Sequence, residues 1–193
     1  MKRFDNLTDP ELIQMYLKGN NEAFATIVMR YKDKMYTAIY LMVKDRYEAE
    51  DILQNVFISI IEALKKGRYN DEKKFLSWAM RIAHNNCINH FRKVKRNPVI
   101  ANSGNRDIAE VFSLNEPGAD NKIIHEESHK KIRMMIDTLP EDQREVIILR
   151  HFADLSFKEI AGLTKCSINT ALGRMRYALI NLRRLMEEKQ MAL

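Results

Sequence analysis

The chain has 193 residues, enough for one domain of ordinary size or two small ones, and its net charge is +6. No apolar run reaches the roughly 18 residues that a membrane-spanning helix needs, and the N-terminal residues lack the hydrophobic core of a signal peptide. These features argue against membrane insertion and predict a cytoplasmic protein.

Helix-breaking residues are scarce. The chain has six Gly and four Pro, and Gly19, Gly67, Pro10 and Pro140 fall at breaks between periodic apolar stretches. This spacing is typical of an all-α fold.

Basic residues are concentrated in two stretches without Asp or Glu. Residues 73–106 contain eight Lys or Arg and residues 160–186 contain five, which together make 13 of the 32 basic residues. Basic side chains without intervening carboxylates create the positive potential that attracts a polyphosphate backbone. The two stretches indicate two contacts with nucleic acid, and two solvated basic helix faces are the alternative.

Before residue 97 the apolar periodicity predicts four helices. The first begins at Thr8, where Glu11 completes a capping box, and the second covers about 21–44. The third begins at a cap formed by Asp45 and Glu48 and continues to Gly67. Its outward face contains Asp51, Gln54, Asn55, Ile58 and Glu62. An exposed isoleucine among polar groups is ordinary, although it also fits a docking surface for another protein.

The fourth helix covers about 73–95, and helical spacing predicts that it buries Leu76, Met80, Ala83, Cys87, Phe91 and Val94. Its outward face then contains Trp78, Arg81, Asn85, Asn89, Arg92 and Arg96. Guanidinium and amide groups donate hydrogen bonds and an indole offers a flat stacking surface, so this face suits unpaired bases and phosphates. The alternative is that Trp78 only covers a neighbouring helix. His84 and His90 belong to the same basic stretch, with no predicted metal role.

Residues 97–119 contain Pro98, Gly104, Pro117 and Gly118 and no sustained helical period, so we interpret them as a linker. A flexible chain of that length spans roughly 25 Å, enough for two modules to reach separate sites on one DNA. The predicted domains are therefore 1–96 and 120–193. A long ordered loop on a single domain is the alternative.

After the linker we expect a helix at about 121–138, a second opened by Pro140, and a helix-turn-helix pair. Ser156 and Glu159 form a capping box, a short turn spans 164–166, and Ser167 caps a long last helix. In such a pair the second helix lies in a major groove, and its first turns here carry Asn169, Thr170, Gly173, Arg174, Arg176 and Tyr177. Any helical hairpin can imitate this pattern.

No cofactor or metal is expected. Cys87 and Cys166 lie far apart without a CxxC pattern and are interpreted as small buried apolar residues. His125 and His129 lie four residues apart, but without a third ligand nearby a solvated face is favoured.

Three segments together resemble the extracytoplasmic-function (ECF) sigma factors, the smallest class of the main bacterial sigma family. They are EAEDILQNVFISIIEAL (48–64), FLSWAMRIAHNNCINHFRK (75–93) and LPEDQREVIILRHFADLSFKEIAGLTKCSINTALGRMRYALINLRR (139–184). The resemblance implies a region 2 module that binds core RNA polymerase and opens the promoter at its minus-10 element. It also implies a region 4 module that reads the minus-35 element, and it leaves room for an anti-sigma factor, which the family commonly uses.

Positions in the chain carry these implied roles. The residues implied to bind core polymerase are Asp51, Gln54, Asn55 and Ile58. The minus-10 surface comprises Arg68, Tyr69, Asn70, Trp78, Arg81, Asn85, Asn89, Arg92, Lys93 and Arg96. The minus-35 surface comprises Ser167, Asn169, Thr170, Arg174, Arg176 and Tyr177.

This sequence departs from the family pattern in a few places. Asn55 stands where the family often has Glu, and Lys165 replaces a frequent turn glycine. Leu172 and Gly173 replace a commonly polar pair in the recognition helix, which removes one expected contact with DNA.

Other classes of function stay open at this point. An ordinary helix-turn-helix regulator would bind its operator without polymerase, and a helical adaptor would show no dependence on DNA. An enzyme is disfavoured, because the sequence has no phosphate-binding glycine loop, HExxH, GxSxG or paired nucleophile and base. We therefore interpret the chain as a non-enzymatic promoter-specificity subunit that acts within the polymerase holoenzyme.

Overall fold

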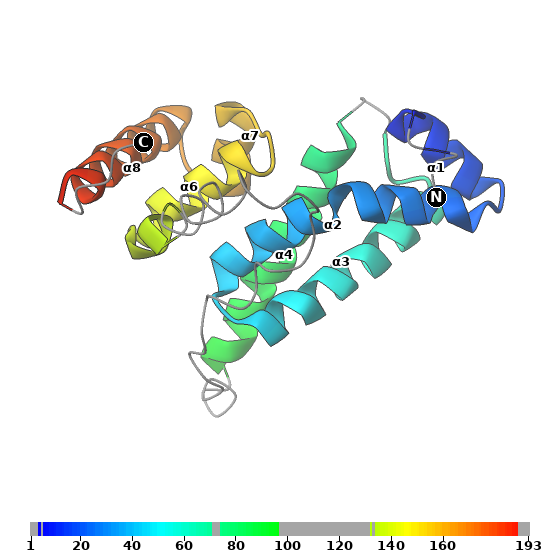
Figure 1. Cartoon of the computed structure of the whole chain (residues 1–193), viewed down its shortest axis with the longest axis horizontal. Coiled ribbons are helices and arrows are strands. Elements are labelled where there is room, and N and C mark those ends of the chain that lie inside the picture. The colour runs from blue at the N-terminus through cyan, green and yellow to red at the C-terminus, as the bar shows by residue number, and fades with distance from the viewer. Residues whose placement is uncertain (1–3, 5, 71–73, 97–131, 133, 189–193) are drawn as a thin grey trace, which may run out of the picture. The chain divides into compact units, whose positions relative to one another are not determined.

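The computed structural model describes residues 4, 6–70, 74–96, 132 and 134–188. These residues form two compact helical units. The first contains α1 (Asp9–Leu17), α2 (Asn21–Val43), α3 (Arg46–Lys65) and α4 (Phe75–Arg96), and the second contains α6 (Glu141–His151), α7 (Phe157–Leu163) and α8 (Ile168–Glu188) (Figure 1). The all-α fold is confirmed. The predicted linker 97–119 and most of the predicted helix at 121–138 lie outside the described residues.

Polar caps fix where helices of the first unit begin. The Glu11 carboxylate accepts hydrogen bonds from the backbone N–H and the hydroxyl of Thr8, each at 2.7 Å, as the predicted capping box requires. The Asp45 carboxylate accepts from the backbone N–H of Glu48 at 3.0 Å. The predicted starts of α1 and α3 are therefore confirmed.

Apolar side chains at helical spacing hold the first unit together. α2 packs against α1, α3 and α4, and α3 packs against α4. Every helix contributes to the core, which includes Leu12, Ile27, Ile39, Ile60 and Phe75. Burial of one such side chain contributes about 1.5–3 kcal/mol, so the core fixes the rotation of each helix and the face that it presents outwards.

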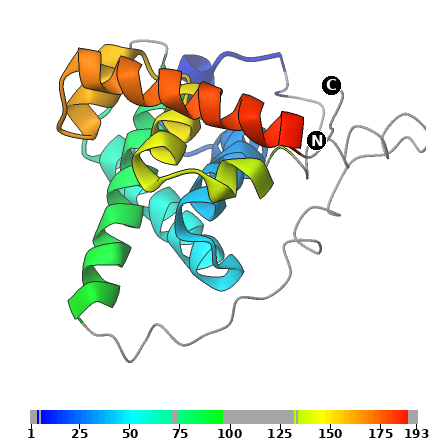
Figure 2. The same cartoon turned by 90° about the vertical axis from the view of Figure 1, so that its left-hand side faces the viewer.

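The buried face of α4 differs in part from the predicted one. Met80, Ala83 and Cys87 are buried as predicted, but Phe91 is 37% exposed and that prediction is wrong. Leu76 and Val94 are only half-buried. No residue of α4 after Cys87 is buried, because the last turns run past the helices on which α4 packs (Figure 2). The periodicity also missed four buried residues of this helix, which are Phe75, Ser77, Ala79 and His84.

The two cysteines differ in their environment. Cys87 is fully buried, and burial raises the pKa of its thiol to about 12, so its interpretation as a small apolar residue is confirmed. Cys166 is only half-buried, and its prediction as a core residue is wrong. The Cys166 sulfur lies 3.2 Å from the Thr164 hydroxyl in an exposed turn, which explains the difference.

The second unit is built around α8. Ile136, Leu139 and Ile147 from the segment before α7 pack with Ala178 of α8. The Asn181 side-chain amide donates to the side-chain oxygen Oε1 of Gln143 at 2.8 Å, which joins α8 to α6. α8 lies across α6 and α7 (Figure 2), so this small core sets which side of α8 faces outwards.

The helix-turn-helix pair of α7 and α8 is present as predicted. The Glu159 carboxylate accepts from the backbone N–H and hydroxyl of Ser156 at 2.8 and 2.6 Å, and the Ser167 hydroxyl accepts from the backbone N–H of Thr170 at 3.0 Å. In the turn between the helices, Lys165 adopts the left-handed conformation with φ of 54°. Glycine adopts this conformation without steric cost and lysine does not, so Lys165 strains the turn.

We therefore expect Lys165→Gly to raise the free energy of unfolding by about 0.5–1 kcal/mol, because Lys165 is exposed and loses no packing. The matched control is Lys158→Gly, which changes an exposed lysine inside α7 and should lower the free energy of unfolding by about 1 kcal/mol. Chemical denaturation measures both. Loss of stability in the Lys165→Gly variant would contradict the left-handed turn.

Candidate nucleic-acid interfaces

Exposed polar side chains form one stripe along α4. Arg81, Asn85, Asn89, Arg92 and Arg96 follow one another at intervals of three or four residues, and all are exposed; we call them the α4 stripe. α4 itself contains no Asp or Glu, and the Arg92 guanidinium donates to the Asn89 amide oxygen at 3.5 Å. The structure therefore brings these predicted residues together on one face. Lys93 is exposed next to Arg92.

Trp78 lies at the edge of the α4 stripe but is half-buried in a cluster of rings. Its ring centroid lies 4.7 Å from that of Tyr69 and 5.8 Å from that of Phe75, and the centroids of Tyr69 and Phe75 are 5.9 Å apart. Such tilted and edge-on pairs contribute about 0.5–1.5 kcal/mol each. Trp78 is therefore partly exposed and also packs against neighbouring rings. This packing was the predicted alternative to a role in base stacking.

The ring cluster is anchored to α1 through Tyr31. The Tyr31 ring centroid lies 5.5 Å from that of Phe75, and the Tyr31 hydroxyl donates to the Asp9 carboxylate at 2.5 Å. Arg30 also pairs with Asp9 at 2.6 Å. Burial, and then the hydrogen bond to Asp9, hold the pKa of Tyr31 above its usual value, so this phenol stays a neutral donor.

The loop after α3 presents two polar side chains to solvent. Gly67 ends α3 with φ of 63°, and the backbone N–H of Arg68 donates to the Ala63 carbonyl at 2.9 Å. Arg68 and Asn70 are exposed, whereas Tyr69 is half-buried in the ring cluster. Of the three predicted loop residues, Arg68 and Asn70 are thus the more accessible.

The histidines of the basic stretch do not extend the α4 stripe. His84 is 4% exposed, and His90 Nδ1 lies 3.2 Å from the Glu48 carboxylate of α3. Across the described ranges no group of three or more His, Cys, Asp or Glu side chains could hold a metal ion. His125 and His129 lie outside the described residues.

The outward face of α3 contains the predicted docking residues. Asp51, Gln54, Asn55 and Ile58 are exposed, with Ile58 at 55%. The Asn55 amide donates to the Asp51 carboxylate at 3.1 Å, which orients that carboxylate. Tyr47 is 75% exposed and lies four residues before Asp51 on the same face. Tyr47 was not among the predicted docking residues, although its spacing from Asp51 could have indicated it.

The first turns of α8 expose part of the predicted reading set. Ser167, Asn169, Thr170, Arg176 and Tyr177 are exposed. Arg174 differs from them, because its guanidinium lies 3.0 Å from the Asp142 carboxylate of α6 and its side chain is only 26% exposed. No sequence pattern predicted this ion pair. It joins α6 to α8 and turns Arg174 towards α6.

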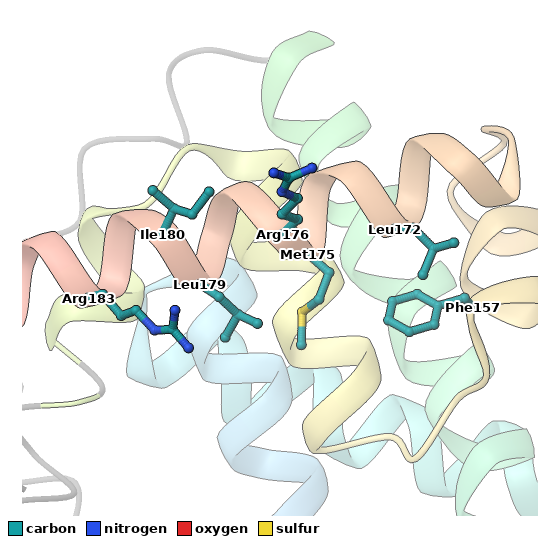
Figure 3. Close-up of a pocket in the computed structure, with 7 residues that line it drawn as sticks. All are labelled: Phe157, Leu172, Met175, Arg176, Leu179, Ile180 and Arg183. Carbon is teal, nitrogen blue, oxygen red and sulfur yellow. The ribbon is translucent and has the colours of Figure 1, made fainter.

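An apolar groove of about 490 Å³ lies between α7 and α8 (Figure 3). Its lining residues are Phe157, Leu172, Met175, Arg176, Leu179, Ile180 and Arg183. Figure 3 shows Leu172 beside the Phe157 ring, with Leu179 further along α8. From the sequence, Leu172 was notable only because it replaces a commonly polar side chain, and the groove was not predicted.

Two segments match models of known protein families. Residues 27–97 match Sigma-70 region 2, and residues 129–177 match Sigma-70, region 4. The RNA polymerase sigma-H factor of Pseudomonas aeruginosa is 30% identical over 172 residues, which cover 86% of this chain and 88% of that protein. The ECF RNA polymerase sigma-E factor of Escherichia coli K12 is 30% identical over 178 residues, which cover 89% and 90%.

Two solved structures share the fold. One is CnrH in complex with the cytosolic domain of CnrY, with a TM-score of 0.59, 20% identity and coverage of 93% of this chain and 97% of that one. The other is the sigma factor RpoE with the anti-sigma factor NepR from Bartonella quintana, with a TM-score of 0.63, 19% identity and coverage of 85% and 96%. Among the described residues no helix has the length and apolar character to span a bilayer.

The ring cluster predicts a stability cost for loss of Tyr69. Tyr69→Ala removes ring packing against Phe75 and Trp78 and should lower the free energy of unfolding by about 1–3 kcal/mol. Tyr47→Ala is the control, because Tyr47 is 75% exposed and its loss should change stability by less than about 0.5 kcal/mol. Equal denaturation midpoints for both variants would show that Tyr69 does not pack as described.

Proposed function

The chain belongs to the sigma-70 family as an RNA polymerase sigma factor of the ECF type, and from this membership we propose how its surfaces share promoter recognition. We assign residues 1–96 to region 2, residues 97–119 to a linker and residues 120–193 to region 4. The observation that carries the proposal is a pair of basic surfaces in separate units, one on α4 and one on α8, within the stretches 73–106 and 160–186 that contain no Asp or Glu. Two such surfaces suit two promoter elements on one DNA.

Region 2 would hold the minus-10 element as separated strands. Guanidinium groups of the α4 stripe bind phosphates, and its amides donate to base edges. Arg68 and Asn70 border the position for an extruded base, and the exposed part of Trp78 offers it a stacking surface. Extrusion of a base costs a few kcal/mol, which these interactions would offset.

Region 4 would read the minus-35 element through the first turns of α8. Asn169, Thr170, Arg176 and Tyr177 are exposed there, and Ser167 lies where a helix N-terminus can meet a phosphate. For Arg174 we propose a different role from the contact with minus-35 DNA that the sequence suggested. Its pairing with Asp142 favours a role in orienting α8 over direct contact with a base.

The outward face of α3 would dock on core polymerase. It combines the Asp51 carboxylate, the amides of Gln54 and Asn55 and the exposed Ile58. Tyr47 adds an exposed amphipathic ring to the same face. An apolar centre with oriented polar groups around it is the composition that protein interfaces favour.

In this proposal the chain is a specificity subunit without catalytic residues of its own, and it acts in the cytoplasm with the polymerase. An anti-sigma factor is a further proposed partner. That proposal is supported by the Bartonella quintana sigma factor of the same fold, whose structure contains one.

Docking on polymerase is tested by Asp51→Lys combined with Gln54→Ala. Charge reversal on the α3 face should weaken binding to core polymerase by about tenfold or more, since truncating one partner of an interfacial charge pair typically costs over 1 kcal/mol. Asp33→Lys combined with Gln14→Ala makes the same changes at exposed positions of α2 and α1 and should leave affinity unchanged. Fluorescence anisotropy with labelled chain measures both, and equal affinities would remove the proposed docking face.

Strand opening is tested by Arg81→Ala combined with Arg92→Ala. Because this variant binds phosphates more weakly, its holoenzyme should yield severalfold fewer permanganate-reactive thymines on a duplex promoter, and a premelted template should restore most of the activity. Asn70→Ala should keep the bubble but weaken the preference for one minus-10 base on either template. If the Arg81→Ala, Arg92→Ala variant opens duplex promoters like the parent chain, the α4 stripe is not the melting surface. If Asn70→Ala keeps the parental base preference, the loop after α3 does not hold the base.

A further inference from the structure

Leu172 and Gly173 lie between two predicted reading residues of α8, with Leu172 exposed and Gly173 half-buried. Asn169 lies one turn before them and Arg176 one turn after them, and both are exposed. Leu172 is 44% exposed. Two residues without hydrogen-bonding side chains therefore separate an amide from a guanidinium on the face that region 4 would turn towards DNA.

The packing of the unit does not explain Gly173. A Cβ atom at this position would meet no atom within 4 Å, so the fold has room for a side chain. Glycine inside a helix destabilises it relative to alanine, and Gly173 lies in the second turn of a helix of 21 residues. A glycine that the fold neither needs nor favours indicates close approach by another molecule.

The surface of Leu172 also suits a base edge. Its side chain lies beside the Phe157 ring at one end of the α7–α8 groove (Figure 3), which restricts its motion without covering it. In the major groove only thymine presents an apolar group, its C5-methyl. Asn pairs best with adenine and Arg with guanine, so Asn169 and Arg176 can read the neighbouring pairs.

We propose that Leu172 and Gly173 set the specificity of minus-35 recognition: Leu172 contacts the methyl group of a thymine, and Gly173 brings the α8 backbone close to the base edges. The inference rests on the proposed function of region 4. Arg174, paired with Asp142, holds α8 at the angle that this contact needs and reads no base itself.

The first experiment removes single methyl groups from DNA. Minus-35 sequences are selected from a randomised library with the complete holoenzyme, and each selected thymine is then replaced by deoxyuridine, which lacks only the C5-methyl. One replacement should weaken promoter binding about fourfold, which corresponds to the free energy gained by burying one methyl group. Leu172→Ala should weaken binding to the thymine promoter and abolish the difference between thymine and deoxyuridine at that position.

Leu179→Ala is the matched control. Leu179 is 45% exposed, lines the same groove and lies seven residues further along the same face, about 10 Å along the helix axis. Its loss should leave the deoxyuridine effect unchanged. If Leu172→Ala and the parent chain respond equally to deoxyuridine, or if no replacement weakens binding, the thymine contact is refuted. Weaker assembly with polymerase in both leucine variants, with the deoxyuridine effect unchanged, would assign the groove to a protein and also overturn the proposal.

The second experiment separates stability from binding at Gly173. Gly173→Ala should raise the melting temperature by a few degrees, because alanine favours the helix, yet weaken binding to the selected promoter severalfold. Gly162→Ala is the control, since Gly162 is exposed in α7 and a Cβ there also meets no atom within 4 Å. It should raise the melting temperature without loss of affinity. Unchanged promoter affinity for Gly173→Ala would refute the close approach of the α8 backbone to the base edges. A library that yields no minus-35 consensus would instead refute the proposed function of region 4 itself.

Discussion

The electrostatic attraction between basic side chains and a phosphate backbone is the interaction on which the two proposed DNA-binding surfaces rest. Because residues 73–106 and 160–186 contain no Asp or Glu, only carboxylates from other parts of the chain can neutralise them. The Glu48 carboxylate lies 3.2 Å from His90 Nδ1, and Asp142 pairs with Arg174. These pairs join neighbouring helices, and the α4 stripe and Arg176 remain exposed. The pairing of Arg174 with Asp142 joins α8 to α6, whereas Arg176 on the same helix is exposed.

Helix packing determines which of these charged side chains lie on the surface. Ile27, Ile60 and Phe75 are buried in one core, and their burial fixes the rotation of α2, α3 and α4. The α4 stripe and the outward face of α3 therefore both lie on the surface around this core. The rings of Tyr69 and Trp78 then tie the loop after α3 to α4. A base extruded beside Asn70 would therefore meet side chains whose positions were set before DNA arrived, which reduces the entropic cost of binding.

Sequence patterns predicted helices better than they predicted side-chain partners. Caps at Thr8, Asp45 and Ser156 are local, so the helix starts and the helix-turn-helix pair could be read from residues three apart. Tertiary contacts are not local: the pairing of Arg174 with Asp142 joins two helices, and no period encodes it. Phe91 matched the apolar period of α4, yet it is 37% exposed, and no residue of α4 after Cys87 is buried. The roles assigned to individual site residues stay predictions.

Genome-wide run-off transcription tests the central claim most directly. Core polymerase is incubated with fragmented genomic DNA with and without the chain, and the 5′ ends of the transcripts are sequenced. We expect a set of start sites that appears only with the chain and shares two motifs, near minus-10 and near minus-35, at constant spacing. Start sites identical to those of core polymerase alone, or a single shared motif, would contradict two separate promoter-binding surfaces.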